Sequence, residues 1–279
     1  MIAFDFAYAQ PDTMEQAIAL HRAYDRPLYY GGGSEIIVMC RAGSIAPDAV
    51  IDLKRIPEAN ALYIEGDDQS EHLVVGGCVS LRAIKDSGLF PLLGLICGRI
   101  ADHTNQCRIT LGGNLCGTIA YRETVLALLL TDADIVLFGS NGLRVTSVHA
   151  AFDGRMRMEP DEFVLQARIP ASFLRLRFAH VKKTAGEKID YPLISVSAIA
   201  CPDGTRFALS GLLTHPFRDL EMEKALNDRS ASRDRRVQSA LACLPGEIVA
   251  DYQGSAEYRR FVLWKTLEAA LEALEEVEA

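Results

Sequence analysis

Two glycine-rich segments constrain the fold of this chain more than any other feature. The first is Gly31-Gly32-Gly33-Ser34, directly after the apolar run 27–30, and the second is Thr110-Leu111-Gly112-Gly113-Asn114. Glycine adopts backbone conformations closed to other residues and lets a ligand approach the main chain. Successive amides in such a segment form an anion-binding nest. Each segment alone is also an ordinary turn between two elements, so both interpretations stay open at this point.

The residues around the first glycine segment predict a small parallel unit. Thr13 and Gln16 have the spacing of a capping box, and the apolar positions that follow predict a helix to about Tyr24. Pro27–Tyr30 and Val50–Leu53 are short apolar runs that predict strands. A strand, a crossover and a second strand at this spacing indicate a parallel βαβ unit.

The remaining chain alternates between strand and helix patterns. Residues 55–170 predict short strands at 62–65, 73–75, 135–138 and 163–169, with helices after Ser80 and over 89–101 and 124–131. Residues 171–279 predict strands over 173–183, 194–201 and 207–213, followed by helices over 218–227, 234–243 and 257–276. In the last helix an apolar stripe is expected to pack within the chain; it consists of Leu263, Leu267, Ala270, Leu271 and Leu274.

Composition excludes several classes of protein. The 279 residues carry a net charge of −8, which argues against a domain that grips nucleic-acid phosphates. The one basic run is expected to be a solvated face; it comprises Arg229, Arg233, Arg235 and Arg236. No apolar run approaches the length that spans a bilayer, and the N-terminus lacks a signal-peptide pattern, so a cytoplasmic location without membrane contact is expected. The seven cysteines lack metal-site spacing and are expected to be small buried hydrophobes.

The familiar nucleotide-binding motifs are absent from the sequence. Ile36 stands where a Rossmann fingerprint needs glycine, and no Walker sequence is present. Glu123 lies nine residues after Asn114 and just before the apolar run 124–131. A carboxylate there can either favour the helix N-terminus or accept hydrogen bonds from a ribose. The residues alone favour the helix-terminal role.

These features in this order resemble the FAD-binding medium subunit of the molybdenum hydroxylases, the family of the xanthine, carbon monoxide and nicotinate dehydrogenases. The resemblance rests on the paired glycine segments, on Glu123 with its helix, and on the run 162–170. It covers nearly the whole chain. The chain differs from the family pattern in having Gln106-Cys107 where Arg-Asn is common, and Glu123 in place of Asp.

The resemblance implies an α+β fold in three parts. Residues 1–54 would form an N-terminal FAD-binding part with a small parallel βαβ unit. Residues 55–170 would form a second FAD-binding part with a mainly antiparallel sheet. Residues 171–279 would form a C-terminal three-stranded sheet with a helix bundle. FAD would lie between the first two parts.

The resemblance also assigns cofactor-binding residues. The first segment would hold the FAD diphosphate through its amides, Glu123 would stand in the acidic position, Val164 would pack near the isoalloxazine, and Lys182 would lie near its edge, close to N1. The complete set is Tyr29, Tyr30, Gly31, Gly32, Gly33, Ser34, Glu35, Ile36, Thr110, Gly112, Gly113, Asn114, Glu123, Val164 and Lys182.

The implied function is electron transfer within a larger complex. FAD would receive electrons from the [2Fe–2S] clusters of one partner subunit, would serve a molybdopterin subunit, and would reduce NAD or another acceptor. Two alternatives stay open. The chain could be a self-sufficient FAD oxidoreductase, with Tyr30, His103 or Tyr121 as the acid or base, or a nucleotide-binding scaffold without a redox role.

Overall fold

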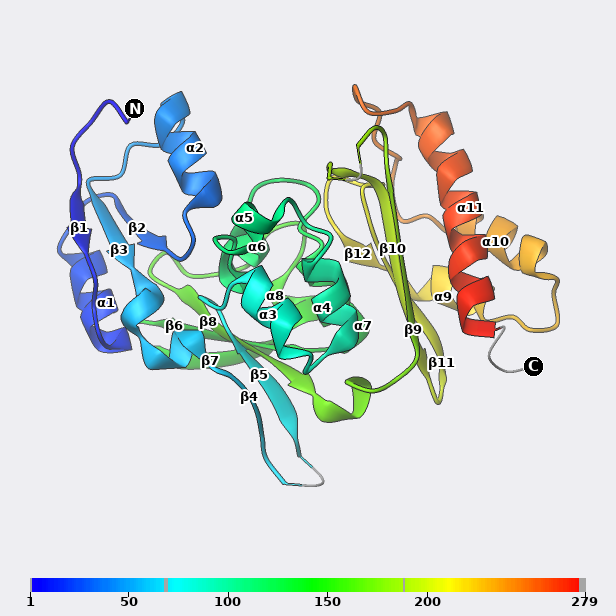
Figure 1. Ribbon diagram of the computed structural model, residues 1–279, viewed down its shortest axis with the longest axis horizontal. Helices are drawn as coiled ribbons and strands as arrows, with labels where there is room; N and C mark the ends of the chain where they lie inside the picture. Colours follow the sequence, from blue (N-terminus) through cyan, green and yellow to red (C-terminus); the bar gives the residue numbers. More distant parts are fainter. Residues whose placement is uncertain (1, 68–69, 188, 276–279) are drawn as a thin grey trace.

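A computed structural model describes residues 2–67, 70–187 and 189–275. Figure 1 shows three parts in a row: an N-terminal sheet with helices beside it, a central sheet covered by short helices, and a C-terminal sheet with helices on its far side. Each sheet lies within one of the three sequence ranges expected above. The predicted α+β class is therefore confirmed, and the boundaries between the parts stay a prediction.

The N-terminal part is the predicted parallel unit. Its sheet has the order β1-β3-β2, and both pairings are parallel. Thr13 caps the first helix as expected, because its side chain accepts a hydrogen bond from the Gln16 amide at 3.2 Å. The elements are β1 (Ala7–Ala9), α1 (Met14–Arg22), β2 (Pro27–Tyr30), α2 (Ser34–Ala42) and β3 (Ala49–Asp52).

The central part is built on an antiparallel five-stranded sheet with the order β4-β5-β8-β6-β7. The edge strand β7 (Gly142–Ser147) is absent from the sequence prediction. The other strands agree with it: β4 (Leu62–Glu65), β5 (His72–Gly76), β6 (Asp134–Gly139) and β8 (Phe163–Pro170).

Short helices cover this sheet, and α7 (Thr124–Leu130) is buried along its whole length. The helix expected over 89–101 is only α4 (Pro91–Cys97), because Pro91 starts it and Gly98 ends it. The remaining helices of this part are α3 (Leu81–Ser87), α5 (His103–Gln106), α6 (Leu111–Cys116) and α8 (Val148–Ala151).

The C-terminal part has the three predicted long strands and a two-residue strand at one edge, in the order β12-β11-β10-β9. The first strand starts at Phe178 rather than 173, because residues 171–173 form a 3-10 turn. Helix α11 packs on the face of the sheet that points away from the central part (Figure 1). The elements are β9 (Phe178–Thr184), β10 (Pro192–Cys201), β11 (Gly204–Ser210), β12 (Phe217–Arg218), α9 (Leu220–Leu226), α10 (Arg233–Ala242) and α11 (Ala256–Glu275).

The predicted apolar stripe of α11 is buried at all five positions; the expected helix end at 276 lies outside the described residues. The predicted solvated basic face is wrong for Arg236 and right only in part for Arg233, whose side chain is 38% exposed. Arg236 is buried and binds Glu275 at 2.6 Å, and Arg233 binds the same carboxylate at 3.2 Å. These contacts join α10 to α11.

The expectation for the cysteines is correct in part. Cys40, Cys78 and Cys97 are buried, whereas Cys107 and Cys116 are exposed. Among the described residues, no helix is both long and apolar enough to cross a bilayer.

Candidate functional site

The first glycine segment leads from β2 into the N-terminus of the nine-residue helix α2. Gly33 precedes the helix with φ of +70°, a left-handed conformation that favours glycine. Within the described part of the chain, the amides of Gly32 and Gly33 donate to no backbone or side-chain acceptor. Unpaired amides beside a helix N-terminus are the donor arrangement that binds an anionic diphosphate.

The second glycine segment is a helix start and not the turn predicted from its sequence. Gly112 and Gly113 lie in the first turn of α6, and Thr110 caps this helix by accepting from the Gly113 amide at 3.1 Å. The Gly112 amide donates to the Gly77 carbonyl at 2.8 Å. The amides of these two glycines are therefore already paired within the protein.

The fold brings the two glycine segments into direct contact. A Cβ atom on Gly31 would lie 2.7 Å from Thr110 Oγ1, and one on Gly32 would lie 1.5 Å from the Arg108 carbonyl oxygen. The absence of side chains at Gly31 and Gly32 therefore permits this approach. Glu35 adds a second link, because its carboxylate accepts from the amide of Thr118 at 2.9 Å and from the hydroxyl of the same residue.

Glu123 and Lys182 form a buried ion pair across the boundary between the central and C-terminal parts. Glu123 Oε2 lies 2.8 Å from Lys182 Nζ, and their side chains are only 4% and 6% exposed. Glu123 Oε1 accepts from the Ser195 hydroxyl at 2.5 Å, and Lys182 also donates to the Arg99 carbonyl at 2.8 Å. Burial raises the pKa of the Glu123 carboxyl, and the nearby ammonium opposes that effect.

This geometry bears on both predicted roles of Glu123. Glu123 is the N-cap residue of α7, where a negative charge favours the helix N-terminus, although its carboxylate makes no capping hydrogen bond to the helix amides. Since each carboxylate oxygen has two lone pairs, a ribose contact would have to use those left by Lys182 and Ser195.

Five further predicted residues differ in burial and contacts, and two of them bind other parts of the protein. Tyr29 donates to the Asp161 carbonyl at 3.0 Å, and burial raises the pKa of its hydroxyl. Asn114 accepts from the Thr124 hydroxyl at 2.6 Å and so joins α6 to α7. Val164 is buried within β8. Ser34 is exposed at the start of α2, and Ile36 is half-buried there.

The candidates for an acid or base are not gathered at one place. The Tyr121 hydroxyl donates to Gln253 at 3.0 Å, and its ring stacks on Tyr191. His103 is exposed on α5. Tyr30 packs beside the first glycine segment. This distribution does not support a self-contained catalytic centre built from these side chains.

Sequence reasoning missed two cations, one beside the first glycine segment and one beside Lys182. Lys54 donates to the Gly31 carbonyl at 3.0 Å, and Arg99 donates to the His180 carbonyl at 3.0 Å. Burial, followed by the Arg99 and Lys182 cations, lowers the pKa of His180 to about 3. Only the position of Lys54 two residues after β3 was a signal, because a strand end beside β2 places it next to the first segment.

Gln106, at a position where the chain departs from the family pattern, has a structural role. It is buried, and its amide nitrogen donates to the carbonyls of Gly98, Ile100 and Ala101. These bonds fix the chain that follows α4, ahead of the second glycine segment.

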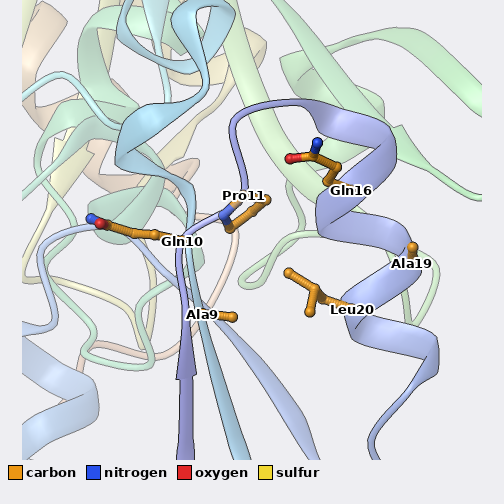
Figure 2. Close-up of a pocket in the computed structure, with 6 residues that line it drawn as sticks. All are labelled: Ala9, Gln10, Pro11, Gln16, Ala19 and Leu20. Carbon is orange, nitrogen blue, oxygen red and sulfur yellow. The ribbon is translucent and has the colours of Figure 1, made fainter.

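Figure 2 shows a surface pocket between β1 and α1. No residue of either glycine segment lines it, although the structure describes all of them. Its lining carries no charged side chain and consists of Ala9, Gln10, Pro11, Gln16, Ala19 and Leu20. We assign no function to this pocket.

Comparisons with known proteins agree on one family. The family model described as "FAD binding domain in molybdopterin dehydrogenase" matches residues 4–172. The glyceraldehyde dehydrogenase medium chain of Sulfolobus acidocaldarius is 23% identical over 270 residues, covering 93% of this chain and 94% of the relative. The carbon monoxide dehydrogenase medium chain of Hydrogenophaga pseudoflava is 25% identical and is covered to 98%, as is this chain.

Solved structures show the same fold. A carbon monoxide dehydrogenase from Hydrogenophaga pseudoflava, which lacks the Mo-pyranopterin moiety of its cofactor, superposes with a TM-score of 0.86. The identity is 23%, and 98% of each chain is covered. Quinoline 2-oxidoreductase from Pseudomonas putida 86 gives a TM-score of 0.84 at 19% identity, with 95% of each chain covered.

Proposed function

Because the chain belongs to the family of FAD-binding domains in molybdopterin dehydrogenases, we propose that it is the electron-transfer subunit of a multi-subunit molybdenum hydroxylase. Family membership over more than half of the chain supports FAD as its cofactor. The observation that carries the proposal is the contact between the two glycine segments, with the Gly32 and Gly33 amides unpaired beside the N-terminus of α2.

The residues present fit FAD. The first segment would hold the anionic diphosphate through the Gly32 and Gly33 amides, with the partial positive charge of α2 behind them. The second segment would contribute a surface free of side chains at Gly113, which is exposed. Lys182 would supply positive charge near the flavin edge and is kept in place by Glu123. When bound, FAD supplies the redox chemistry, and the protein supplies binding, orientation and electrostatics.

The partners follow from the same reasoning. The relatives are named as medium chains, a term for one subunit among several. We propose that a partner subunit with [2Fe–2S] clusters delivers electrons, that a molybdopterin subunit oxidises the substrate, and that NAD or another acceptor removes the electrons. The scattered positions of Tyr30, His103 and Tyr121 favour this division of labour over a self-sufficient enzyme.

Two measurements test the proposal. Titration of the purified chain with FAD, followed by removal of the excess, should leave flavin absorption equivalent to about one FAD per chain. The holo-chain, reduced under anaerobic conditions and then mixed with NAD, with a quinone or with oxygen-containing buffer in turn, should be reoxidised by its acceptor. A chain that stays colourless, both alone and when co-expressed with the proposed iron–sulfur and molybdopterin subunits, would overturn the proposal.

A further inference from the structure

Lys54 contacts the first glycine segment, the tyrosine that precedes it and the last residue of β3. It belongs to the 3-10 turn Leu53–Arg55, directly after β3. Its ammonium donates to the Gly31 carbonyl at 3.0 Å and to Asp52 Oδ2 at 2.7 Å. It also lies 4.3 Å from the centre of the Tyr30 ring, within the range of a cation–π contact.

The Tyr30 ring, which Lys54 contacts, also packs against Gly33, the residue of the segment with a left-handed backbone conformation. A Cβ atom on Gly33 would lie 2.2 Å from the ring, so the ring packs directly against the Gly33 backbone. Lys54 therefore restrains the segment at two places. Its hydrogen bond fixes the Gly31 carbonyl, and its contact with Tyr30 fixes the ring that supports Gly33.

Asp52 fixes the position of the Lys54 ammonium. Its side chain is 1% exposed and accepts from the hydroxyl of Tyr8, from Gln10 Nε2 at 3.2 Å and from the Lys54 amide at 3.0 Å. A carboxylate held so rigidly beside a diphosphate site would repel the ligand. The Lys54 ammonium offsets the negative charge of Asp52. It also donates to the Gly31 carbonyl oxygen, whose lone pairs would otherwise repel a nearby anion.

We infer that Lys54 is a positioning residue for FAD, which holds the Gly32 and Gly33 amides in the orientation that a dinucleotide diphosphate requires. The inference rests on the proposed function. The Lys54 ammonium would orient the uncharged glycine segment through a charge-assisted hydrogen bond, and the amides of that segment would then bind the anionic diphosphate.

The test is FAD affinity of the full chain, measured by quenching of flavin fluorescence. Lys54→Met should weaken FAD binding at least about tenfold, since it removes charge-assisted hydrogen bonds. Lys54→Arg keeps the cation and should restore the affinity to within about threefold of the original. Lys54→Met leaves the buried Asp52 carboxylate without its cation but with hydrogen bonds from Tyr8, Gln10 and the backbone amide of residue 54, so the cofactor-free variant should stay folded with a lowered melting temperature.

A matched control is the neighbouring cation. Arg55 belongs to the same turn but binds Asp12 on the surface, so Arg55→Met should leave FAD affinity unchanged. The role of Lys54 would be overturned if Lys54→Met bound FAD as tightly as the original chain, or if Arg55→Met lost as much affinity. It would also be overturned if the loss in Lys54→Met were explained by unfolding of the cofactor-free variant. If the original chain itself binds no FAD, the proposed function fails and not this inference alone.

Discussion

At the scale of single residues, the most unusual environment is that of His180. Its Nδ1 lies 2.9 Å from the Ser197 hydroxyl, and its Nε2 is buried without a hydrogen-bond partner among the described residues. Since burial and two nearby cations lower the pKa of His180 to about 3, the ring stays neutral in the folded protein at ordinary pH. In the unfolded chain the same ring takes up a proton below about pH 6.5.

This difference predicts a pH dependence of stability. Between about pH 4 and 6 the unfolded state binds one more proton at His180, so the free energy of unfolding falls by about 1.4 kcal/mol for each unit that the pH decreases. His180→Gln removes the titrating group. Urea denaturation across this range should give a stability that falls less steeply in the variant, by about that amount per unit. Equal slopes would mean that His180 is charged in the folded protein.

At the scale of helices and strands, the sequence correctly predicts the elements whose ends depend on residues close to them in the chain. Thr13, part of the predicted capping box, and Ser80, which precedes a predicted helix, cap α1 and α3. Helix α6 was missed because two glycines favour a turn; its start depends on Thr110 and on the Gly77 carbonyl, which lies more than thirty residues away in sequence. Strand β7 was missed because it is an exposed edge strand whose apolar residues, Leu143 and Val145, face outward.

The site was predictable in its parts and not in its pairings. The glycine segments and Glu123 stand out in the sequence, whereas Lys182 was assigned only through the family resemblance. The pairing of Glu123 with Lys182 depends on how the C-terminal sheet packs on α7, and no local pattern encodes that packing. The same holds for the contact between Gly32 and the Arg108 carbonyl.

The contact between the two glycine segments predicts that adding one methyl group at Gly32 destabilises the protein. Gly32→Ala places a Cβ 1.5 Å from a backbone oxygen, so the segments must move apart. We expect a loss of about 1–3 kcal/mol in the free energy of unfolding, as for other overpacked sites, together with weaker FAD binding. Chemical denaturation and FAD titration measure the two effects.

Gly43→Ala, at the other end of α2, is the matched control. Gly43 has φ of +72° but no atom within 4 Å of its Cβ position. Gly43→Ala should therefore lower the free energy of unfolding by about 1 kcal/mol through backbone strain alone, without a steric clash, and FAD binding should be unchanged. A Gly32→Ala chain that binds FAD as tightly as the Gly43→Ala chain would contradict the expected separation of the segments.

At the scale of the whole molecule, the C-terminal sheet holds α7 at both ends. Lys182 and Ser195 bind Glu123 just before the helix. Arg206 and Arg218 donate to the carbonyls of residues 130 and 129 at its C-terminus, both at about 3 Å. The apolar core is shared as well, since Ile199 and Ala208 belong to the cluster that contains α7. The central and C-terminal parts are therefore expected to unfold together.

The ion pair at the start of α7 tests this coupling. Lys182→Met leaves the Glu123 carboxylate buried without its cation, which should cost about 3–5 kcal/mol in the free energy of unfolding of the full chain. Adding Glu123→Gln removes the unpaired charge and should recover a large share of that loss, because the carboxamide still accepts from Ser195. Lys183→Met, at the exposed neighbouring position on β9, should change stability by less than about 0.5 kcal/mol. If Lys182→Met were no more destabilising than Lys183→Met, the pair would contribute nothing to the docking of the two parts, and the packed core around α7 alone would hold them together.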